Sequence, residues 1–171
     1  MKRGVLLFNL GGPETLHDVR PFLYNLFSDP DIIHIKNDLL RKSLALIIAS
    51  FRQGKSRNLY RQIGGGSPLR QITEAQAAAL EDVLSSRNMK ATVYVGMRCW
   101  KPTIDEAVTR ILKDQITHLV LLPLYPQYSM TTTGSCLKYF MALENRLKLS
   151  LKMKISAIES WFDEPLYVAS M

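Results

Sequence analysis

Cysteine and histidine are scarce in this sequence, and their scarcity excludes several kinds of site. The chain contains two cysteines, Cys99 and Cys136, and three histidines. The cysteines form neither a CxxC pair nor a disulfide framework, so we expect reduced thiols. His17, His34 and His118 have no HxxxH partner and no cysteine or carboxylate neighbours at metal-ligand spacing. Spacing alone therefore assigns no metal site and no nucleophilic triad.

Long apolar runs and blocks of one charge are absent as well. No apolar run reaches the length of a membrane span, and the first expected strand begins too close to Met1 to leave room for a signal peptide. We therefore expect a cytoplasmic protein, with a peripheral membrane contact left open. The net charge is +7, but no Lys/Arg-only run or nucleic-acid module is present, so no nucleic-acid partner is expected.

The positive charge is concentrated in one part of the chain. Between Lys36 and Arg70 there are eight lysines and arginines and a single acid, Asp38. An excess of this kind in a short stretch favours a local site for an anionic small molecule.

Short apolar runs alternate with helical patterns along the chain. The runs at 4–9, 92–97, 119–122 and 153–158 predict strands that are covered on both faces. Between them, apolar residues recur at helical spacing. The alternation predicts an α/β domain with a four-stranded parallel sheet and helices on both faces, of Rossmann-like type. A length of 171 residues fits one domain.

Two helix boundaries can be predicted from local patterns. A helix is expected after Asn37, and its apolar stripe consists of Leu40, Leu44, Ile47 and Phe51. The polar, basic segment 52–57 is expected to be the mobile end of this helix. Farther along, Thr73–Gln76 matches a capping box, which predicts the start of the next long helix.

Three consecutive glycines, Gly64–Gly66, lie between these two helices. Glycine allows positive φ and close backbone approach, and Pro68 suits the first turn of a helix. Ser67 offers a hydroxyl that can cap the helix or contact a ligand. The neighbouring basic and aromatic residues are Arg52, Tyr60, Arg61 and Arg70. Two interpretations stay open: a tight turn between helices, and a loop against an acidic, partly flat ligand.

Loops that follow the carboxyl ends of parallel strands are the usual ligand positions in such sheets. Arg98 directly follows an expected strand, where it serves either in a site or in a structural ion pair. Tyr125 and Tyr128 offer flat faces with hydroxyl tips, suited to an aromatic ligand or to core packing. Cys99 is either a functional thiol or a small packing residue.

Four of these segments together resemble the ferrochelatase family. They are residues 6–15 (LLFNLGGPET), 63–68 (IGGGSP), 94–98 (YVGMR) and 124–129 (LYPQYS), in the family's order and spacing. The resemblance spans essentially the whole chain. It implies that residues 1–171 form the N-terminal, chelatase-type domain of an enzyme with two similar α/β domains and a porphyrin between them.

The resemblance also implies a function and a set of site residues. Family members insert Fe²⁺ into a dicarboxylic porphyrin such as protoporphyrin IX, or into coproporphyrin, a lyase reaction of haem biosynthesis. By motif position, the implied porphyrin-binding residues are Leu10, Arg52, Tyr60, Ser67 and Tyr125. Arg52 and Ser67 are implied near the propionates, Leu10 against one macrocycle face, and Arg98 near the path of the metal.

No catalytic residue is implied within this chain. The family's catalytic histidine and a conserved glutamate belong to the C-terminal domain, which this chain lacks, so we expect the isolated chain to be inactive. The implied partners are porphyrin, ferrous iron as a substrate, and that missing domain. Met130 stands where animal members have a cluster-binding cysteine, so no iron–sulfur cluster or other resident cofactor is expected.

Two positions depart from the family's usual Met-Arg-Tyr-Trp-His-Pro. Cys99 replaces the tyrosine and Lys101 the histidine, which changes local hydrogen bonding and metal access. Three alternatives remain open. The first is a chelatase for another metal or tetrapyrrole, and the second is a non-catalytic tetrapyrrole-binding or pairing module. The third is a truncated product that folds poorly because it exposes a former interface.

Overall fold

The computed structural model describes residues 1–171 and contains four strands. They are β1 (Arg3–Asn9), β2 (Ala91–Met97), β3 (His118–Pro123) and β4 (Lys154–Ala157). The α-helices are α1 (Val19–Phe27), α2 (Asp38–Gln62), α3 (Leu69–Ser86), α4 (Ile104–Lys113), α5 (Ser135–Leu147) and α6 (Pro165–Ala169). A π-helical turn, η1 (Met130–Gly134), precedes α5, and a 3₁₀ turn, η2 (Leu149–Leu151), follows it. None of the helices combines the length and apolar character needed to cross a membrane.

The four strands form one sheet with all neighbours parallel, in the order β2-β1-β3-β4. Each strand expected from an apolar run is present, and no boundary differs by more than one residue. The strand β1 lies in the interior of the sheet, and Leu6 pairs with Tyr94 on one side and Leu121 on the other. The predicted four-stranded parallel sheet is confirmed.

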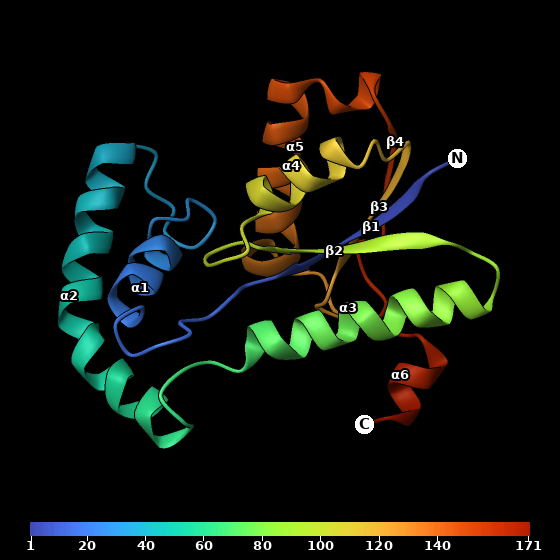
Figure 1. Cartoon of the computed structure of the whole chain (residues 1–171). Helices are drawn as coiled ribbons and strands as arrows, with labels where there is room; N and C mark the ends of the chain where they lie inside the picture. The colour runs from blue at the N-terminus through green and yellow to red at the C-terminus, as the bar shows by residue number, and fades with distance from the viewer.

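Helices cover both faces of this sheet, as predicted. Figure 1 shows α4 and α5 on one face and α3 on the other. Because side chains alternate along a strand, Leu6 and Phe8 of β1 enter the core under α4 and α5, whereas Val5 and Leu7 enter the core under α3. The core that contains Phe8 is the larger of the two. In it the ring of Phe140 from α5 packs against the ring of Phe8, and the two ring centroids are 6.0 Å apart.

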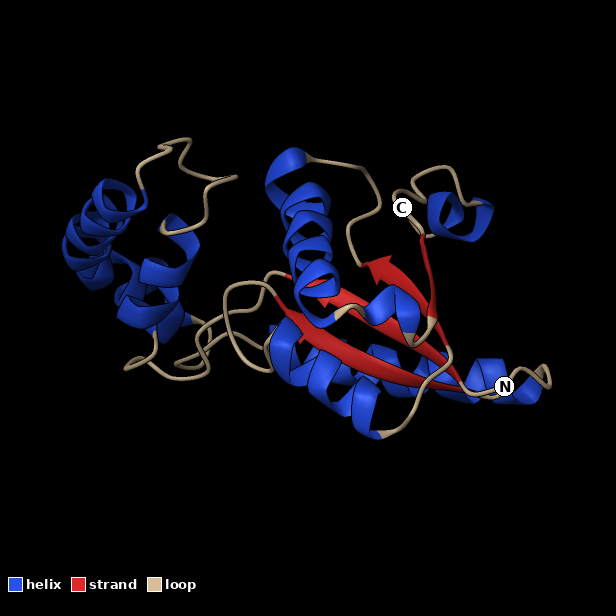
Figure 2. Ribbon diagram, turned by 90° about the horizontal axis from the view of Figure 1, so that it is seen from above, coloured by secondary structure: helices blue, strands red, loops and turns tan.

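The helices α1 and α2 form a separate pair beyond the carboxyl ends of the strands (Figures 1 and 2). They have their own apolar cluster, in which Val19, Phe22 and Leu23 of α1 meet Ala49 of α2 and Cys99 of the loop after β2. This pair therefore adds a wall to the edge of the sheet where ligands of α/β folds bind.

Two expectations for α2 are wrong. Segment 52–57 is not a mobile end, because α2 continues as a helix through Gln62. The buried face is not the predicted stripe either, because the side chains of Ile47 and Phe51 are exposed, Phe51 by 85%. The small residues Ala45 and Ala49 face inward instead, both fully buried.

Arg41, placed off the stripe in sequence, is buried beside these alanines. Its guanidinium donates hydrogen bonds to the carbonyl oxygens of Ser28 (2.9 Å) and Ile35 (2.7 Å) and pairs with Asp38. Backbone carbonyls of the turn after α1 therefore hold this charged side chain, which hydrophobic patterning would place in solvent.

The helix α3 also begins earlier than the capping-box pattern predicts. It starts at Leu69, directly after Pro68, and Thr73 lies within its second turn. The Thr73 hydroxyl donates to the Leu69 carbonyl oxygen (2.7 Å) and accepts from Nδ2 of Asn9 (3.1 Å). Thr73 is fully buried, so its hydroxyl ties α3 to the end of β1 rather than capping a helix.

Candidate functional site

Backbone hydrogen bonds bring the loops after β1, β2 and β3 together at one edge of the sheet. The amides of Arg98 and Cys99 donate to the carbonyl oxygens of Asn9 and Leu10, both at 2.9 Å, and the Leu124 amide donates to Phe8 (2.9 Å). Leu10, Arg98 and Tyr125, predicted from separate motifs, therefore lie along the same carboxyl-terminal edge, and the α1–α2 pair stands over it (Figure 1).

The glycine loop ends α2 with a Schellman motif. Gly64 and Gly65 have φ angles of +101° and +91°, a backbone conformation that residues with a Cβ rarely adopt. The Gly65 amide donates to the Tyr60 carbonyl oxygen (2.8 Å) and the Gly64 amide to that of Arg61 (3.4 Å). The first two glycines thus belong to a turn between helices, which was one of the two interpretations of this loop.

Gly66 has a different function, which is close packing against another loop. A Cβ at this position would lie 2.1 Å from the Glu14 carbonyl oxygen. The next amide, that of Ser67, donates to the Pro13 carbonyl oxygen (2.7 Å), and a Cβ on Gly12 would lie 2.5 Å from Ser67 Oγ. Ser67 therefore packs against the loop that follows β1, at Gly12, which is two residues after Leu10.

The basic residues around this loop differ in how they are paired. Arg70 bonds to Glu14 (3.0 Å) and Glu74 (2.9 Å), and Arg61 donates to Oδ1 of Asn58 (2.8 Å). Arg52 is exposed and makes no ion pair, and its Cζ lies 5.5 Å from the centroid of the Phe27 ring. Arg52 and Arg61 are therefore both exposed without an ion pair, and Arg52 is the one that lies against an aromatic ring.

An apolar wall lies beside Arg52. Leu10, Phe27, Tyr60 and Trp100 are partly buried and pack against the cluster of the α1–α2 pair. Burial raises the pKa of Tyr60, so the phenol stays neutral near physiological pH. The arrangement combines apolar and aromatic side chains with the guanidinium of Arg52, which has no ion pair and lies against Phe27. Such a combination fits a flat ligand that carries carboxylates.

Arg98 is held in a buried polar cluster. Its Nη2 lies 3.0 Å from Oδ2 of Asp29, and its Nε donates to Ser135 Oγ at 2.9 Å. The Ser135 hydroxyl in turn donates to Asp29 Oδ2 (2.5 Å), and the Tyr139 ring lies 4.4 Å below the guanidinium. The ion pair considered for Arg98 from sequence is therefore present, at the edge where a site role was also expected.

Tyr125 lies near two thiols, those of Cys99 and Cys136. It packs against the larger core, and its hydroxyl is buried without a hydrogen-bond partner. Burial raises the pKa of Tyr125, and the neighbouring Cys136 and Cys99 add to the rise. A buried, unpaired phenol is a costly feature in a folded protein.

Both thiols are buried, so we expect them to be unreactive in the folded protein. Burial raises the pKa of Cys99 and of Cys136 to about 12, although the Arg98 guanidinium opposes the rise. At pH 8 a thiol with that pKa is ionised in about one molecule in 10⁴, and the thiolate is the reactive form. Iodoacetamide should label neither cysteine rapidly until denaturant is added, as mass spectrometry would show. Rapid labelling of Cys99 in the folded chain would support the functional thiol instead.

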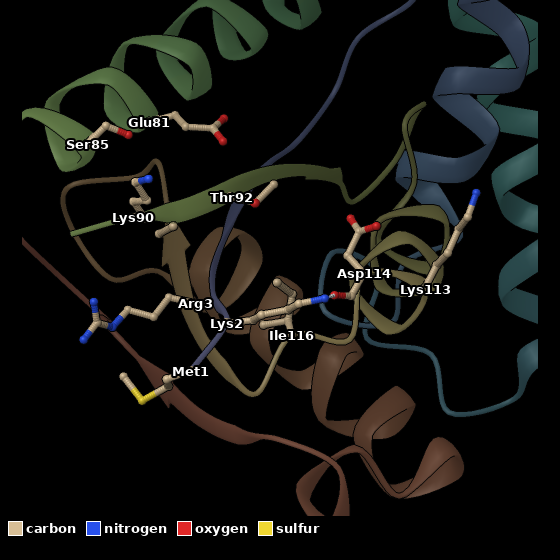
Figure 3. A pocket seen from close by; sticks show the side chains of 11 residues that line it. Met1, Lys2, Arg3, Glu81, Ser85, Lys90, Thr92, Lys113, Asp114 and Ile116 are labelled. Carbon is tan, nitrogen blue, oxygen red and sulfur yellow. Dashed lines mark hydrogen bonds between the residues drawn. The ribbon is translucent and has the colours of Figure 1, made fainter. Parts of the chain in front are cut away.

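A hollow of about 630 Å³ lies at the opposite end of the sheet (Figure 3). Among its lining residues are Lys2, Lys90 and Lys113, and Lys2 Nζ donates to the Asp114 carbonyl oxygen (3.1 Å). None of the predicted site residues lines it, and it lies near the amino ends of the strands. The size of a hollow is therefore not a guide to the site here.

No set of three or more His, Cys, Asp or Glu side chains is arranged to hold a metal ion.

Sequence reasoning missed Asp29 and Ser135, the two partners of Arg98. Asp29 stands in the Ser28–Asp31 segment, whose composition signals only the end of a helix, and Ser135 opens α5 after a run of hydroxyl residues. The one available signal was Arg98 itself, because a charge that follows a buried strand needs a counter-charge.

Comparison with known proteins identifies the family of this chain. The ferrochelatase family model matches residues 2–171. The ferrochelatase of Rippkaea orientalis is 52% identical over 168 residues, which cover 98% of this chain and 43% of that protein. Ferrochelatase-2, chloroplastic, of Hordeum vulgare is 52% identical over 172 residues, or 99% of this chain and 36% of that protein. The ferrochelatase of Picosynechococcus sp. is 49% identical over 168 residues, which cover 98% of this chain and 44% of that protein.

The match thus extends over nearly all of this chain, while the chain spans less than half the length of each of these relatives. The relatives are named for an enzyme activity, and the fold is the α/β domain expected for such proteins. On the family match over residues 2–171, this chain belongs to the ferrochelatase family.

Proposed function

We propose that this chain forms the porphyrin-binding wall of an enzyme that inserts Fe²⁺ into a porphyrin with propionate side chains. In this proposal the chain is the N-terminal α/β half of a two-domain protein, and the other half encloses the porphyrin and supplies the base that removes the pyrrole protons. The family match and the partial coverage of every relative named above support this division.

The observation that carries the proposal is the unpaired Arg52 beside the apolar wall of the α1–α2 pair. A porphyrin is flat and apolar over most of its area, and its propionates are anionic. Leu10 and Tyr60 would contact the macrocycle, while Arg52 and the Ser67 hydroxyl would bind carboxylates. A guanidinium suits this task because it offers several donors in a fixed plane.

Replacing Arg52 with alanine should weaken porphyrin binding about tenfold, the usual scale for losing one charge-assisted hydrogen bond. The measurement is a fluorescence titration of the chain with protoporphyrin IX. Arg61→Ala is the matched control, because Arg61 lies nine residues, or about two and a half turns, farther along the same helix and so on its other side. Equal losses in the two variants would point to general charge attraction and against a propionate site at Arg52.

Metal insertion separates the proposed function from the alternatives that the sequence left open. The 171-residue chain should bind porphyrin but leave Zn²⁺ insertion at the uncatalysed rate, as absorbance spectra would show. Adding the part of the Rippkaea orientalis ferrochelatase that this chain does not match should raise the rate. Insertion by the chain alone would contradict the assignment of the base to the other half, and His17, His34 and His118 would be the first residues to replace.

A further inference from the structure

We propose that the outer edge of β2 is a docking site for an acidic, extended peptide segment of a separate partner protein, which adds a fifth strand to the sheet. The surface, which we call the β2 groove, runs between α3 and α4 and has Val93 and Val95 of β2 in its lining. It contains none of the proposed porphyrin-binding residues, so the proposal goes beyond the proposed function.

The first support is the unpaired backbone of β2, an outer strand that pairs only with β1. The Arg98 amide donates toward β1, to Asn9 (2.9 Å), whereas the preceding amide, that of Met97, donates away from it, to the Pro102 carbonyl oxygen (2.6 Å). Backbone groups of successive residues in a strand point to opposite edges, so those of Val93 also point away from β1. No group of the chain bonds to them, and an open edge of this kind is a template for a strand of another chain.

The second support is a continuous space along this edge. Three hollows of about 510, 240 and 630 Å³ follow one another beside β2. The middle hollow shares Pro102 and Arg110 with the first and Glu81 with the last. Figure 3 looks onto the last one, where Glu81 of α3 and Asp114 at the end of α4 lie on opposite sides of β2. A strand of seven residues is about 20 Å long, so a segment of about that length can follow the groove.

Small side chains keep the middle of the groove open. On the α3 side the middle hollow is lined by Ala77 and Ala78, and Ala78 is exposed. Side chains of an added strand point alternately to its two faces. Those that point toward α3 can therefore enter the space between these alanines and Val93.

The third support is the free positive charge in the lining. Glu74 pairs with Arg70 (2.9 Å), and the Asp114 carboxylate accepts from the Tyr94 hydroxyl (2.7 Å). These carboxylates are thus engaged within the chain. An acidic segment therefore complements the groove, whose lining cations without an ion pair are Lys2, Arg3, Lys90, Lys101, Arg110 and Lys113.

The position of the groove favours a separate protein as the source of the segment. In the proposed function, the other half of the enzyme lies with the porphyrin at the carboxyl-terminal edge of the sheet. The β2 groove instead extends to the amino ends of the strands, where its largest hollow lies (Figure 3).

The test measures fluorescence polarisation of the labelled heptapeptide EEVTVEE, whose glutamates can reach both ends of the groove and whose central residues favour a strand. It should bind saturably to the folded 171-residue chain. The peptide KKVTVKK, with the opposite charge, should bind about tenfold more weakly. The peptide EEVPVEE keeps the charge, but its proline lacks a backbone donor and should also lower the affinity about tenfold.

Two variants of α3 locate the binding. Ala78→Glu places a carboxylate and a larger side chain in the middle hollow and should weaken binding of EEVTVEE about tenfold. Ala79→Glu is the matched control, because Ala79 is exposed on the same helix and lines none of the three hollows. It should change the affinity less than about twofold. Glutamate is a good helix former, so both variants should fold, as circular dichroism would verify.

Hydrogen exchange reads the edge directly. In the free chain, the outward Val93 amide should exchange about tenfold faster than that of Tyr94, which points toward β1, and saturating EEVTVEE should slow it about tenfold. Absence of EEVTVEE binding, equal affinities for EEVTVEE and EEVPVEE, or equal losses in the two α3 variants would each overturn the proposal. So would protection of Val93 by the part of the Rippkaea orientalis ferrochelatase that this chain does not match, since the occupant would then be the other half of the enzyme. These measurements involve no porphyrin, so their outcome is independent of the proposed function.

Discussion

Replacing Phe140 with alanine is expected to lower the free energy of unfolding by about 3–5 kcal/mol. Phe140 of α5 is fully buried, and its ring packs against that of Phe8, with centroids 6.0 Å apart and planes inclined at 57°. The substitution removes a large apolar volume from the core between the sheet and α5, and close-packed neighbours cannot fill the space completely. Chemical denaturation followed by circular dichroism would measure the loss.

The adjacent residue provides the control for this prediction. Met141 lies on the same helix with 58% of its surface exposed, so Met141→Ala should change stability by no more than about 0.5 kcal/mol. Because the free energy of unfolding of small domains is only about 5–15 kcal/mol, Phe140→Ala should remove a large part of it. A loss below about 1 kcal/mol would contradict the packing described for the larger core.

Replacing Gly66 with alanine is expected to destabilise the chain by about 1–3 kcal/mol, the range for forcing extra atoms into a packed site. The new Cβ would lie 2.1 Å from the carbonyl oxygen and 2.6 Å from the carbonyl carbon of Glu14. One of the two loops must move, and the bond from the Ser67 amide to Pro13 would break with it. Porphyrin affinity should fall together with stability, because Ser67 would leave its position near Leu10.

Gly54→Ala is the matched control, with an effect of opposite sign. Gly54 lies within α2, and nothing occupies the space within 4 Å of a Cβ at that position. Alanine favours a helix over glycine by about 1 kcal/mol, so this variant should be more stable and should bind porphyrin unchanged. If Gly66→Ala were as stable as the unchanged chain, the close contact between the two loops would be wrong.

The sheet could be predicted from sequence because its signal is local. The four apolar runs gave strands whose boundaries are correct to within one residue, and their alternation with helices gave the parallel arrangement. The glycine loop also carried its conformation in its sequence: Gly64 and Gly65 end a helix, and Pro68 precedes the next.

The packing of α2 could not be predicted in this way. Pattern reasoning places the largest apolar side chains in the core, but α2 approaches α1 through Ala45 and Ala49 and leaves Phe51 in solvent. The close approach depends on small residues, and it is decided by the partner helix rather than by the pattern of α2. Likewise, the contact between Gly66 and Glu14 joins loops that are remote in sequence.

Part of the geometry of the candidate site follows from the family motifs, whereas the binding roles of its residues stay a prediction. Family motifs pointed to Leu10, Tyr60 and Ser67, and the structure places all three along the surface formed by the α1–α2 pair and the loop after β1. The pairing of Arg98 could not be read from sequence, because Asp29 and Ser135 come from distant segments. A charge that follows a strand shows that a partner is needed but not which residue supplies it.

The most direct test of the account compares protoporphyrin IX with its dimethyl ester in fluorescence titrations of the 171-residue chain. The two ligands share the macrocycle and differ in the charge of the propionates. The comparison therefore isolates the contribution of propionate charge, which we assign to pairing with Arg52, to the binding free energy. We predict saturable binding of one porphyrin per chain, with the free acid bound about tenfold more tightly than the ester. Equal affinities, or no binding of either ligand, would contradict the assignment of this surface as a propionate-binding porphyrin wall.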